Sequence, residues 1–372
     1  MSEHVDKNFN LSAPPPSNCK YVNALDIKNA LYGVYFDEGD GIYRRMPNAV
    51  AKTVNFGVTF YSKATTGGSL KLKTNSNYLA IKATVPKDKL LTIMPSASQF
   101  GFAISGKGVY YGYITYDYDK AKESGNTEIT FEGTVWLPDN SMRELTVHFP
   151  VYGTVNELFI GVEEGCVLEK GCNYLYEKPI VFYGSSITQG GCASRSDMDY
   201  ISILGKMLDS NYLNLGFAGS CHGEQAMAEY LAGLDASVFV IDYDANAAEP
   251  KELEENHYPL YKTIRNKNPE TPIVFITRPH VERGKRDGAS ANVTFIDYND
   301  NQKQKALYSV IWGNYLRGKE EGDKNLYFID GHTLFGTEFR ELCTVDGTHP
   351  NDLGFYRMAQ TIYPVLKEIL EK

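Results

Sequence analysis

The stretch VFYGSSITQGG, residues 181–191, joins an apolar run to two adjacent serines and then to a pair of glycines. A short apolar run that ends at glycine is typical of a buried strand followed by a turn. Serine is common in turns, so the segment alone does not separate a reactive serine from a polar turn residue. The rest of the chain has to decide between these interpretations.

Beyond residue 178, short apolar runs alternate with helical patterns. The runs occupy residues 180–184, 212–217, 238–243, 273–278 and 326–331. Apolar residues at helical spacing occur at 199–208, at 224–234, over about 298–317, and near the C-terminus. Strands that alternate with helices predict an α/β domain with a parallel sheet covered by helices on both faces. Such a sheet binds ligands beyond the carboxyl ends of its strands.

The preceding part of the chain, from about residue 20 to 175, has the alternating apolar and polar pattern of strands without helices. The stretch SLKLKTNSNYLAIKATVP, residues 69–86, predicts a hairpin that turns at TNSN. Strands at this spacing indicate an antiparallel β-sandwich, jelly-roll-like in kind. We therefore expect a β-sandwich domain over residues 1–177 and a catalytic domain over residues 178–372.

Composition excludes several classes of partner. The net charge of −9 argues against binding to the phosphates of a nucleic acid. The first residues, MSEHVDKNFNLSAPPPSN, lack the apolar segment of a secretory signal, and no run is long enough to span a membrane. The six cysteines have no zinc-binding spacing, and the seven histidines are scattered. We expect a cytoplasmic protein without a metal or other cofactor; its oligomeric state stays open.

Five residue types suited to acyl transfer follow the predicted strands. Ser186 follows the first strand, Gly219 the second and Asn246 the third, while Asp346 and His349 follow the fifth. A serine nucleophile needs a base, and the base needs a group that orients it. The backbone N–H groups of Ser186 and Gly219 and the amide of Asn246 are donors of the kind that stabilise an oxyanion. Chance assembly of all five is improbable, which favours a catalytic interpretation.

This order of residues resembles the SGNH hydrolase superfamily, the GDSL-type esterases, over residues 178–372. The resemblance implies a flavodoxin-like, three-layer α/β domain. By that resemblance Ser186 is the nucleophile, His349 the base and Asp346 the residue that orients it. The resemblance also implies an oxyanion hole made by Ser186, Gly219 and Asn246. The stretch DGTHPN at 346–351 fits the last sequence block of the superfamily closely.

One position departs from the superfamily pattern. The usual Gly-Asp-Ser is Gly-Ser-Ser here, with Ser185 in place of aspartate. That aspartate is not the acid of the triad, so we expect Ser185 to be a turn residue and the mechanism to survive. Thr188 stands where the Gly-x-Ser-x-Gly motif of α/β-hydrolases has glycine, which disfavours that fold.

Other stretches are similar to the SGNH branch that carries an N-terminal β-sandwich and includes carbohydrate O-acetyl esterases. They are GSSITQGG, LGFAGSCHGE and, in the leading domain, GDGIYRRMP at 39–47. The resemblance implies a serine esterase that removes acetyl groups from oligosaccharides. Arg278, Glu224 and Arg44 are candidate substrate-binding residues, although an arginine such as Arg44 is more often a solvated surface residue.

Two alternatives remain open. The same catalytic groups would serve a lipid-directed esterase, a lysophospholipase or a thioesterase, which needs an apolar acyl channel. No loop of the sequence stands out as rich in exposed Leu or Phe, so we disfavour these activities. The other alternative is a carbohydrate-binding protein whose second domain has lost activity, and the intact set of catalytic residue types argues against it.

Overall fold

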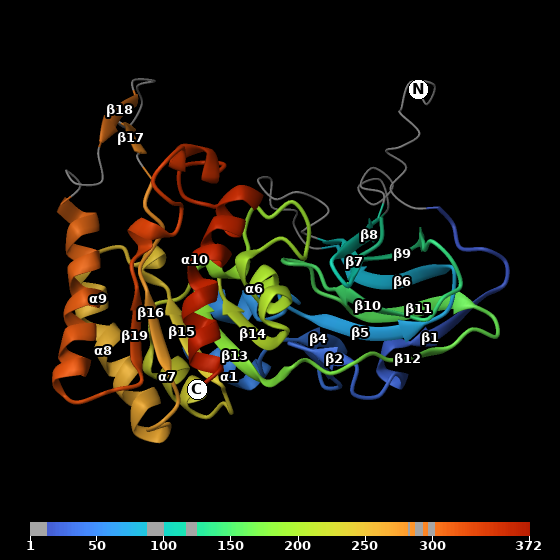
Figure 1. The fold of residues 1–372 in the computed structure, drawn as a ribbon, viewed down its shortest axis with the longest axis horizontal. Coiled ribbons are helices and arrows are strands. Elements are labelled where there is room, and N and C mark those ends of the chain that lie inside the picture. Colours follow the sequence, from blue (N-terminus) through green and yellow to red (C-terminus); the bar gives the residue numbers. More distant parts are fainter. Residues whose placement is uncertain (1–12, 88–99, 117–124, 282, 287–292, 297–301) are drawn as a thin grey trace. The chain divides into compact units, whose positions relative to one another are not determined.

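The computed structural model describes residues 13–87, 100–116, 125–281, 283–286, 293–296 and 302–372 (Figure 1). The chain forms two compact units. The second unit consists of residues 46–62, 174–193 and 198–372, and the first contains the remaining residues. Each unit therefore takes in a short segment that lies, in sequence, within the other, and a single boundary after residue 177 does not describe this exchange.

Two large antiparallel sheets build the first unit, as the sequence predicts. In the first sheet the strand order is β1-β11-β6-β9; these strands are Cys19–Asn23, Glu157–Glu163, Tyr78–Pro86 and Glu128–Trp136. In the second the order is β12-β5-β10-β7-β8; these are Leu168–Lys170, Ser69–Thr74, Arg143–His148, Phe102–Gly106 and Val109–Ile114. The short strand β2, Leu31–Tyr32, also pairs with β5. Apolar side chains from both sheets form one core, which is the arrangement of a β-sandwich.

The predicted hairpin at residues 69–86 is wrong. Strand β5 pairs with β10, β12 and β2, whereas β6 pairs with β9 and β11 in the other sheet. The TNSN segment therefore carries the chain from one sheet to the other. Alternation identifies each strand correctly, but it does not specify the partner, since both strands present an apolar face to the same core.

Two short helices stand where the sequence indicated strands alone. They are α1, Asn48–Val54, and α2, Phe56–Tyr61, and both belong to the second unit. Asn55 caps α2, because its side chain accepts a hydrogen bond from the Val58 N–H. Val and Thr are frequent in this segment and favour strands, so tertiary packing overrides local propensity here.

The second unit contains a five-stranded parallel sheet in the order β14-β13-β15-β16-β19, the flavodoxin-like order that the sequence predicts. The strands are Ser210–Gly216, Tyr176–Gly184, Val238–Asp242, Ile273–Ile276 and Leu326–Ile329. Gly184, at the end of β13, aligns with Gly216 of β14 and with Asp242 of β15. The ends of these three adjacent strands therefore lie side by side, and the loops that follow them share one edge.

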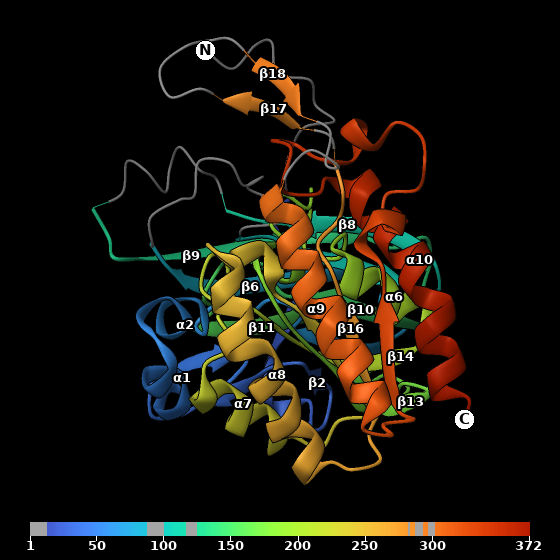
Figure 2. The same ribbon diagram turned by 90° about the vertical axis from the view of Figure 1, so that its left-hand side faces the viewer.

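Helices cover both faces of this sheet, which confirms the three-layer α/β fold. One face packs against α7, α8 and α9, which are Gln225–Ala232, Pro250–Lys267 and Gln302–Glu320. The other packs against α6 and α10, which are Tyr200–Leu208 and Asp352–Leu370. Figure 2 shows α8 and α9 on one side of the strands and α10 on the other. Helix α8 was not predicted from the sequence, although Leu253, Leu260 and Ile264 recur there at helical spacing.

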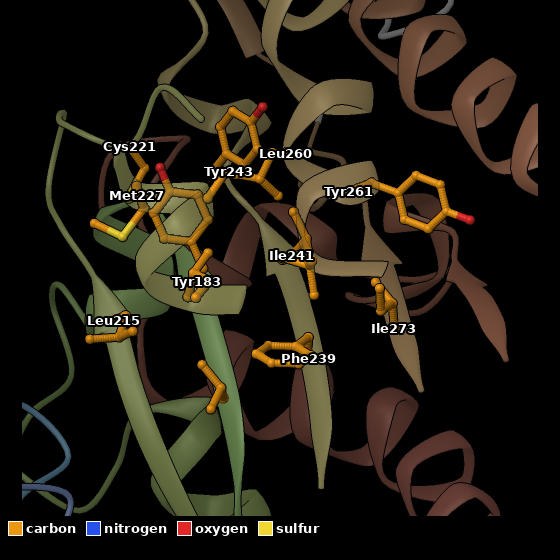
Figure 3. Close-up of a cluster of buried hydrophobic side chains, with 14 of the residues drawn as sticks. Tyr183, Leu215, Cys221, Met227, Phe239, Ile241, Tyr243, Leu260, Tyr261 and Ile273 are labelled. Atoms are coloured by element: carbon orange, nitrogen blue, oxygen red, sulfur yellow. The ribbon is translucent and has the colours of Figure 1, made fainter. Parts of the chain in front are cut away.

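Figure 3 shows how the core under α7 and α8 is built, with Phe239 and Ile241 of β15 beside Tyr183 of β13 and Leu215 of β14. Every one of these four side chains is at most 1% exposed. Residues 180–184 of β13 and all of β15 are buried, so the strand ends that precede the catalytic loops are packed on both faces. None of the described helices is both long and apolar enough to span a membrane.

Candidate active site

Residues 185–189, within the stretch VFYGSSITQGG, form the turn and the short helix after β13. Ser185 is the N-cap of α5, Ser186–Gln189, and its Oγ accepts a hydrogen bond from the Ile187 N–H at 3.2 Å. Gly184 must be glycine, because a Cβ there would lie 2.0 Å from the Thr188 Oγ1 and 2.1 Å from the Asp242 carbonyl oxygen. Ser185 is thus a buried capping residue, and Ser186 begins the helix with its side chain partly exposed.

The structure brings Ser186, His349 and Asp346 into one chain of hydrogen bonds. The Oγ of Ser186 lies 2.9 Å from the Nε2 of His349. The Nδ1 of His349 lies 2.7 Å from the Oδ2 of Asp346. The side chains of His349 and Asp346 keep 21% and 39% of their surface exposed, so the chain of bonds lies at the surface of this unit. This geometry is the one that a serine nucleophile, its base and an orienting carboxylate require.

The loop that carries Asp346 and His349 is closed by its own backbone. The Oδ1 of Asp346 accepts hydrogen bonds from the N–H groups of Thr348 and His349 at 2.9 and 2.8 Å. The Val345 N–H donates to the His349 carbonyl at 3.0 Å. Partial desolvation raises the pKa of Asp346, but the bonds from His349 and Thr348 outweigh it and leave that pKa below its usual value. The carboxylate is therefore ionised where it faces the imidazole.

Three donors are found at the strand ends beside Ser186. The N–H groups of Ser186 and Gly219 make no hydrogen bond within the described part of the chain. Gly219 has a φ of +63°, within the turn that follows β14. Asn246 ends a short 3-10 helix after β15, and its Nδ2 donates to the Phe217 carbonyl at 3.3 Å. The amide keeps a second N–H, so all three residues retain a donor for a developing oxyanion.

Behind the nucleophile lies a buried network that the sequence analysis missed. The Oδ2 of Asp242 accepts hydrogen bonds from the Thr188 Oγ1 and the Tyr200 hydroxyl, both at 3.0 Å. Burial, and secondly the Asp244 carboxylate, raise the pKa of Asp242 to about 8. Thr188 belongs to α5, so this carboxyl group ties the helix of Ser186 to β15 and α6. The sequence offered one signal for this network, because Asp242 is the polar residue that ends the otherwise apolar strand β15.

The three candidate substrate-binding residues have different surroundings. Arg278 follows β16 and is partly exposed; its N–H donates to the Oδ2 of Asp244 at 3.0 Å. The Oε1 of Glu224 accepts a hydrogen bond from the Asn55 side chain. Within the described residues, neither Arg278 nor Glu224 is hydrogen-bonded to Ser186, His349 or Asp346.

Arg44 requires a correction. It ends β4, Ile42–Arg44, which pairs with β3, Tyr35–Asp37, in the first unit. Its side chain is 1% exposed and lies 2.6 Å from the Asp40 carboxylate and 3.7 Å from that of Asp37. It is neither a solvated surface arginine nor available to a ligand, because it neutralises the two carboxylates of its own hairpin. Arg44 of the GDGIYRRMP motif therefore has a structural role within its own hairpin.

Comparisons with known proteins agree with this geometry. The sequence pattern of the GDSL-like Lipase/Acylhydrolase family matches residues 177–367. The pattern for the N-terminus of SGNH hydrolase-type esterases matches residues 19–168. No match was found among curated proteins.

Solved structures extend the likeness to nearly the whole chain. A candidate GDSL-like lipase from Bacteroides ovatus is 29% identical, with a TM-score of 0.80 over 95% of this chain and 98% of that one. A salicylyl-acyltransferase from a tetracycline biosynthetic pathway is 19% identical, with a TM-score of 0.72 over the same shares. A family two carbohydrate esterase from Clostridium thermocellum, solved with cellohexaose, is 15% identical, with a TM-score of 0.58 over 82% of this chain and 93% of that one. The chain belongs to the GDSL-like lipase/acylhydrolase family and is an SGNH-type esterase with the N-terminal domain of that branch.

Proposed function

We propose that this esterase removes acetyl groups from oligosaccharides through an acyl-enzyme formed on Ser186. The observation that carries the proposal is the continuous chain of hydrogen bonds from Ser186 through His349 to Asp346, at 2.9 and 2.7 Å. A serine hydroxyl is a weak nucleophile at neutral pH, and this arrangement supplies the base that it needs.

Each half-reaction uses the same groups. His349 removes the proton from the Ser186 hydroxyl as the Oγ attacks the ester carbonyl. The N–H groups of Ser186 and Gly219 and the amide of Asn246 hold the negative oxygen of the tetrahedral intermediate. His349 then gives its proton to the departing sugar hydroxyl, which leaves the acyl group on Ser186. Water, deprotonated by His349, attacks the acyl-enzyme, and collapse of the second intermediate releases acetate and restores the serine.

Small residues near the oxyanion donors support a short acyl group. Ala218 and Ser220 flank Gly219, and Ala245 and Ala247 flank Asn246. These side chains offer little apolar surface on which a long acyl chain could be buried. The carbohydrate part of the proposal draws its support from the shared fold, because family two carbohydrate esterases have the same architecture.

A second candidate, a lipid-directed esterase or thioesterase, is favoured by one observation. Phe339, Leu342 and Val345 are 63%, 55% and 55% exposed in the segment just before Asp346. The expectation that no loop exposes Leu and Phe is therefore wrong. We name the side chains of these three residues the apolar loop. An exposed apolar surface beside a catalytic loop suits a substrate with a hydrocarbon chain.

One experiment separates the two candidates. Initial rates are measured with aryl esters from acetyl to octanoyl, beside acetate release from acetylated oligosaccharides. Our proposal requires acetate release from the oligosaccharides and the highest kcat/KM with the acetyl ester. A kcat/KM that rises steadily towards octanoyl would instead support the lipid or thioester candidate.

A further inference from the structure

The Gly219 turn, which supplies one of the oxyanion donors, is held from two sides. We define it as residues 217–220; the Ser220 N–H closes it by donating to the Phe217 carbonyl at 3.0 Å. A Cβ built on Gly219 would meet no atom within 4 Å. Gly219 itself therefore has no side-chain packing, and its N–H is positioned through the contacts of the neighbouring residues of the turn.

On one side the turn is attached to the helix of the nucleophile. The Ala218 N–H donates to the Oε1 of Gln189 at 2.8 Å, and Gln189 is fully buried at the end of α5. This bond sets the position of the Gly219 turn relative to Ser186. It acts on the residue before Gly219, whereas Ser220, the residue after it, is held by other contacts.

On the other side the turn is attached to α2, through Asn55. The Nδ2 of Asn55 donates to the Ser220 carbonyl at 3.0 Å and also to the Glu224 carboxylate. Its Oδ1 accepts from the Val58 N–H at 2.7 Å, so the same side chain caps α2. The approach is close, because a Cβ on Gly57 would lie 1.9 Å from the Oγ of Ser220. All of these residues belong to the second unit.

We propose that Asn55 is a positioning residue for the reaction, because it fixes the Gly219 N–H at the oxyanion site. The inference rests on the proposed function. An oxyanion donor acts only when it lies about 2.7–3.1 Å from the oxygen, so a small displacement of the turn weakens it. The oxyanion exists in the transition state and not in bound substrate, so loss of the Asn55 bond lowers kcat and leaves KM unchanged.

Asn55→Ser tests the proposal, because serine also caps helices but is too short to reach the Ser220 carbonyl. The matched control is Asn23→Ser. Asn23 caps a 3-10 helix of the first unit by accepting from the Leu25 N–H at 2.9 Å, so the same substitution there exchanges one capping residue for another, away from the Gly219 turn. We expect kcat for an aryl acetate to fall roughly tenfold or more in Asn55→Ser, less than the loss of a whole donor. KM and the unfolding midpoint should stay near those of the control.

A second measurement and a second variant test the same role of Asn55. Affinity for an alkyl boronic acid, whose tetrahedral adduct resembles the intermediate, should fall in parallel with kcat. Should Asn55→Ser fold poorly, Asn55→Asp retains the size and the capping oxygen and lacks the N–H, and the same loss is expected. A folded variant of either kind with wild-type kcat overturns the role of Asn55 while the esterase activity stands. A wild-type protein that releases no acyl group overturns the proposed function itself, and this inference with it.

Discussion

The Nε2 of His349 lies 2.9 Å from the Oγ of Ser186, although 163 positions separate the two residues in the sequence. Ser186 begins α5, directly after β13, an interior strand of the parallel sheet, and His349 stands in the loop before α10. The parallel order brings both to one edge, because every strand of such a sheet ends on the same side. The fold thereby makes a base available to a serine that has none among its sequence neighbours.

The first prediction concerns the two adjacent serines. Ser186→Ala should lower ester hydrolysis on the order of 10⁴-fold, since the nucleophile is gone. Ser185→Ala should keep most of the activity and lose about 0.5–2 kcal/mol of stability, because Ser185 only caps α5. Mass spectrometry after fluorophosphonate labelling should place the adduct on Ser186. An adduct on Ser185 would reverse the two assignments.

The second prediction concerns the acid. Asp346→Asn retains the Oδ1 that accepts the Thr348 and His349 N–H groups, so the loop should keep its shape. The new amide would face the Nδ1 of His349 without a negative charge, which disturbs the ring's tautomer and removes its charge stabilisation. We expect kcat to fall by about 10⁴ while the variant stays folded, with at most a small decrease in its unfolding midpoint, because the lowered pKa of Asp346 contributes some stability. Near-normal turnover would mean that His349 acts without help from this carboxylate.

The residues of the candidate site could be predicted from the sequence, whereas the long-range contacts that surround them could not. Ser186, Gly219, Asn246 and His349 each follow a strand or precede a helix, and one rule about parallel sheets places them together. The partner of β5 and the docking of α2 have no comparable local signal, because they depend on which distant surfaces are complementary. Asn55 illustrates the limit: in the sequence it is one polar residue in a stretch that favours strands.

The third prediction concerns residues 46–62, which lie early in the sequence and belong to the second unit. Met46, Ala51 and Val58 are 0% exposed and share the core of β13 and β14. A fragment of residues 178–372 lacks them, so we expect it to expose that core and fail to fold cooperatively. In the full chain Met46→Ala should cost about 2–5 kcal/mol in urea unfolding. Met207→Ala, at a methionine that is 38% exposed, is the control and should change stability by less than about 0.5 kcal/mol.

A fully folded, active 178–372 fragment would contradict this prediction. So would a Met46→Ala variant no less stable than the Met207→Ala control.

The fourth prediction concerns pH. Burial first, and then the Asp244 carboxylate, raise the pKa of Asp242 from 3.8 to about 8. The folded protein therefore keeps this proton at pH values where the unfolded chain has lost it. Between about pH 4 and pH 8 the folded state binds more protons, so the contribution of Asp242 to stability decreases as the pH rises.

Asp242→Asn lacks this ionisation and keeps an oxygen that can accept from Thr188 and Tyr200. The free energy of unfolding of the wild type, minus that of the variant, should become smaller as the pH rises from 4.5 to 7.5. Urea unfolding at several pH values measures it. Parallel pH profiles for the two proteins would show that Asp242 ionises freely in the folded state.

The last prediction concerns the acyl group and the apolar loop. Each methylene buried against an apolar surface contributes about 0.8 kcal/mol, which is about fourfold in kcat/KM. If the apolar loop bound the acyl chain, the two extra methylenes of a butyryl ester would raise kcat/KM by roughly tenfold or more over acetyl. We expect the reverse, because Gly219 and Asn246 are flanked by small residues that provide no such surface for the acyl chain.

The double substitution Phe339→Asn, Leu342→Gln makes this expectation sharper. Both side chains are more than half exposed, so their loss should change stability by less than about 0.5 kcal/mol each. Leu175→Gln is the matched control, because Leu175 is 70% exposed and precedes β13, at the opposite end of the strand from Ser186. With acetyl as the preferred group, the double variant and the control should hydrolyse acetyl esters at the wild-type rate. A selective loss of octanoyl hydrolysis in the double variant, from a wild type that prefers octanoyl, would establish the apolar loop as the acyl-binding surface, provided that Leu175→Gln, which removes an exposed leucine elsewhere, shows no such loss.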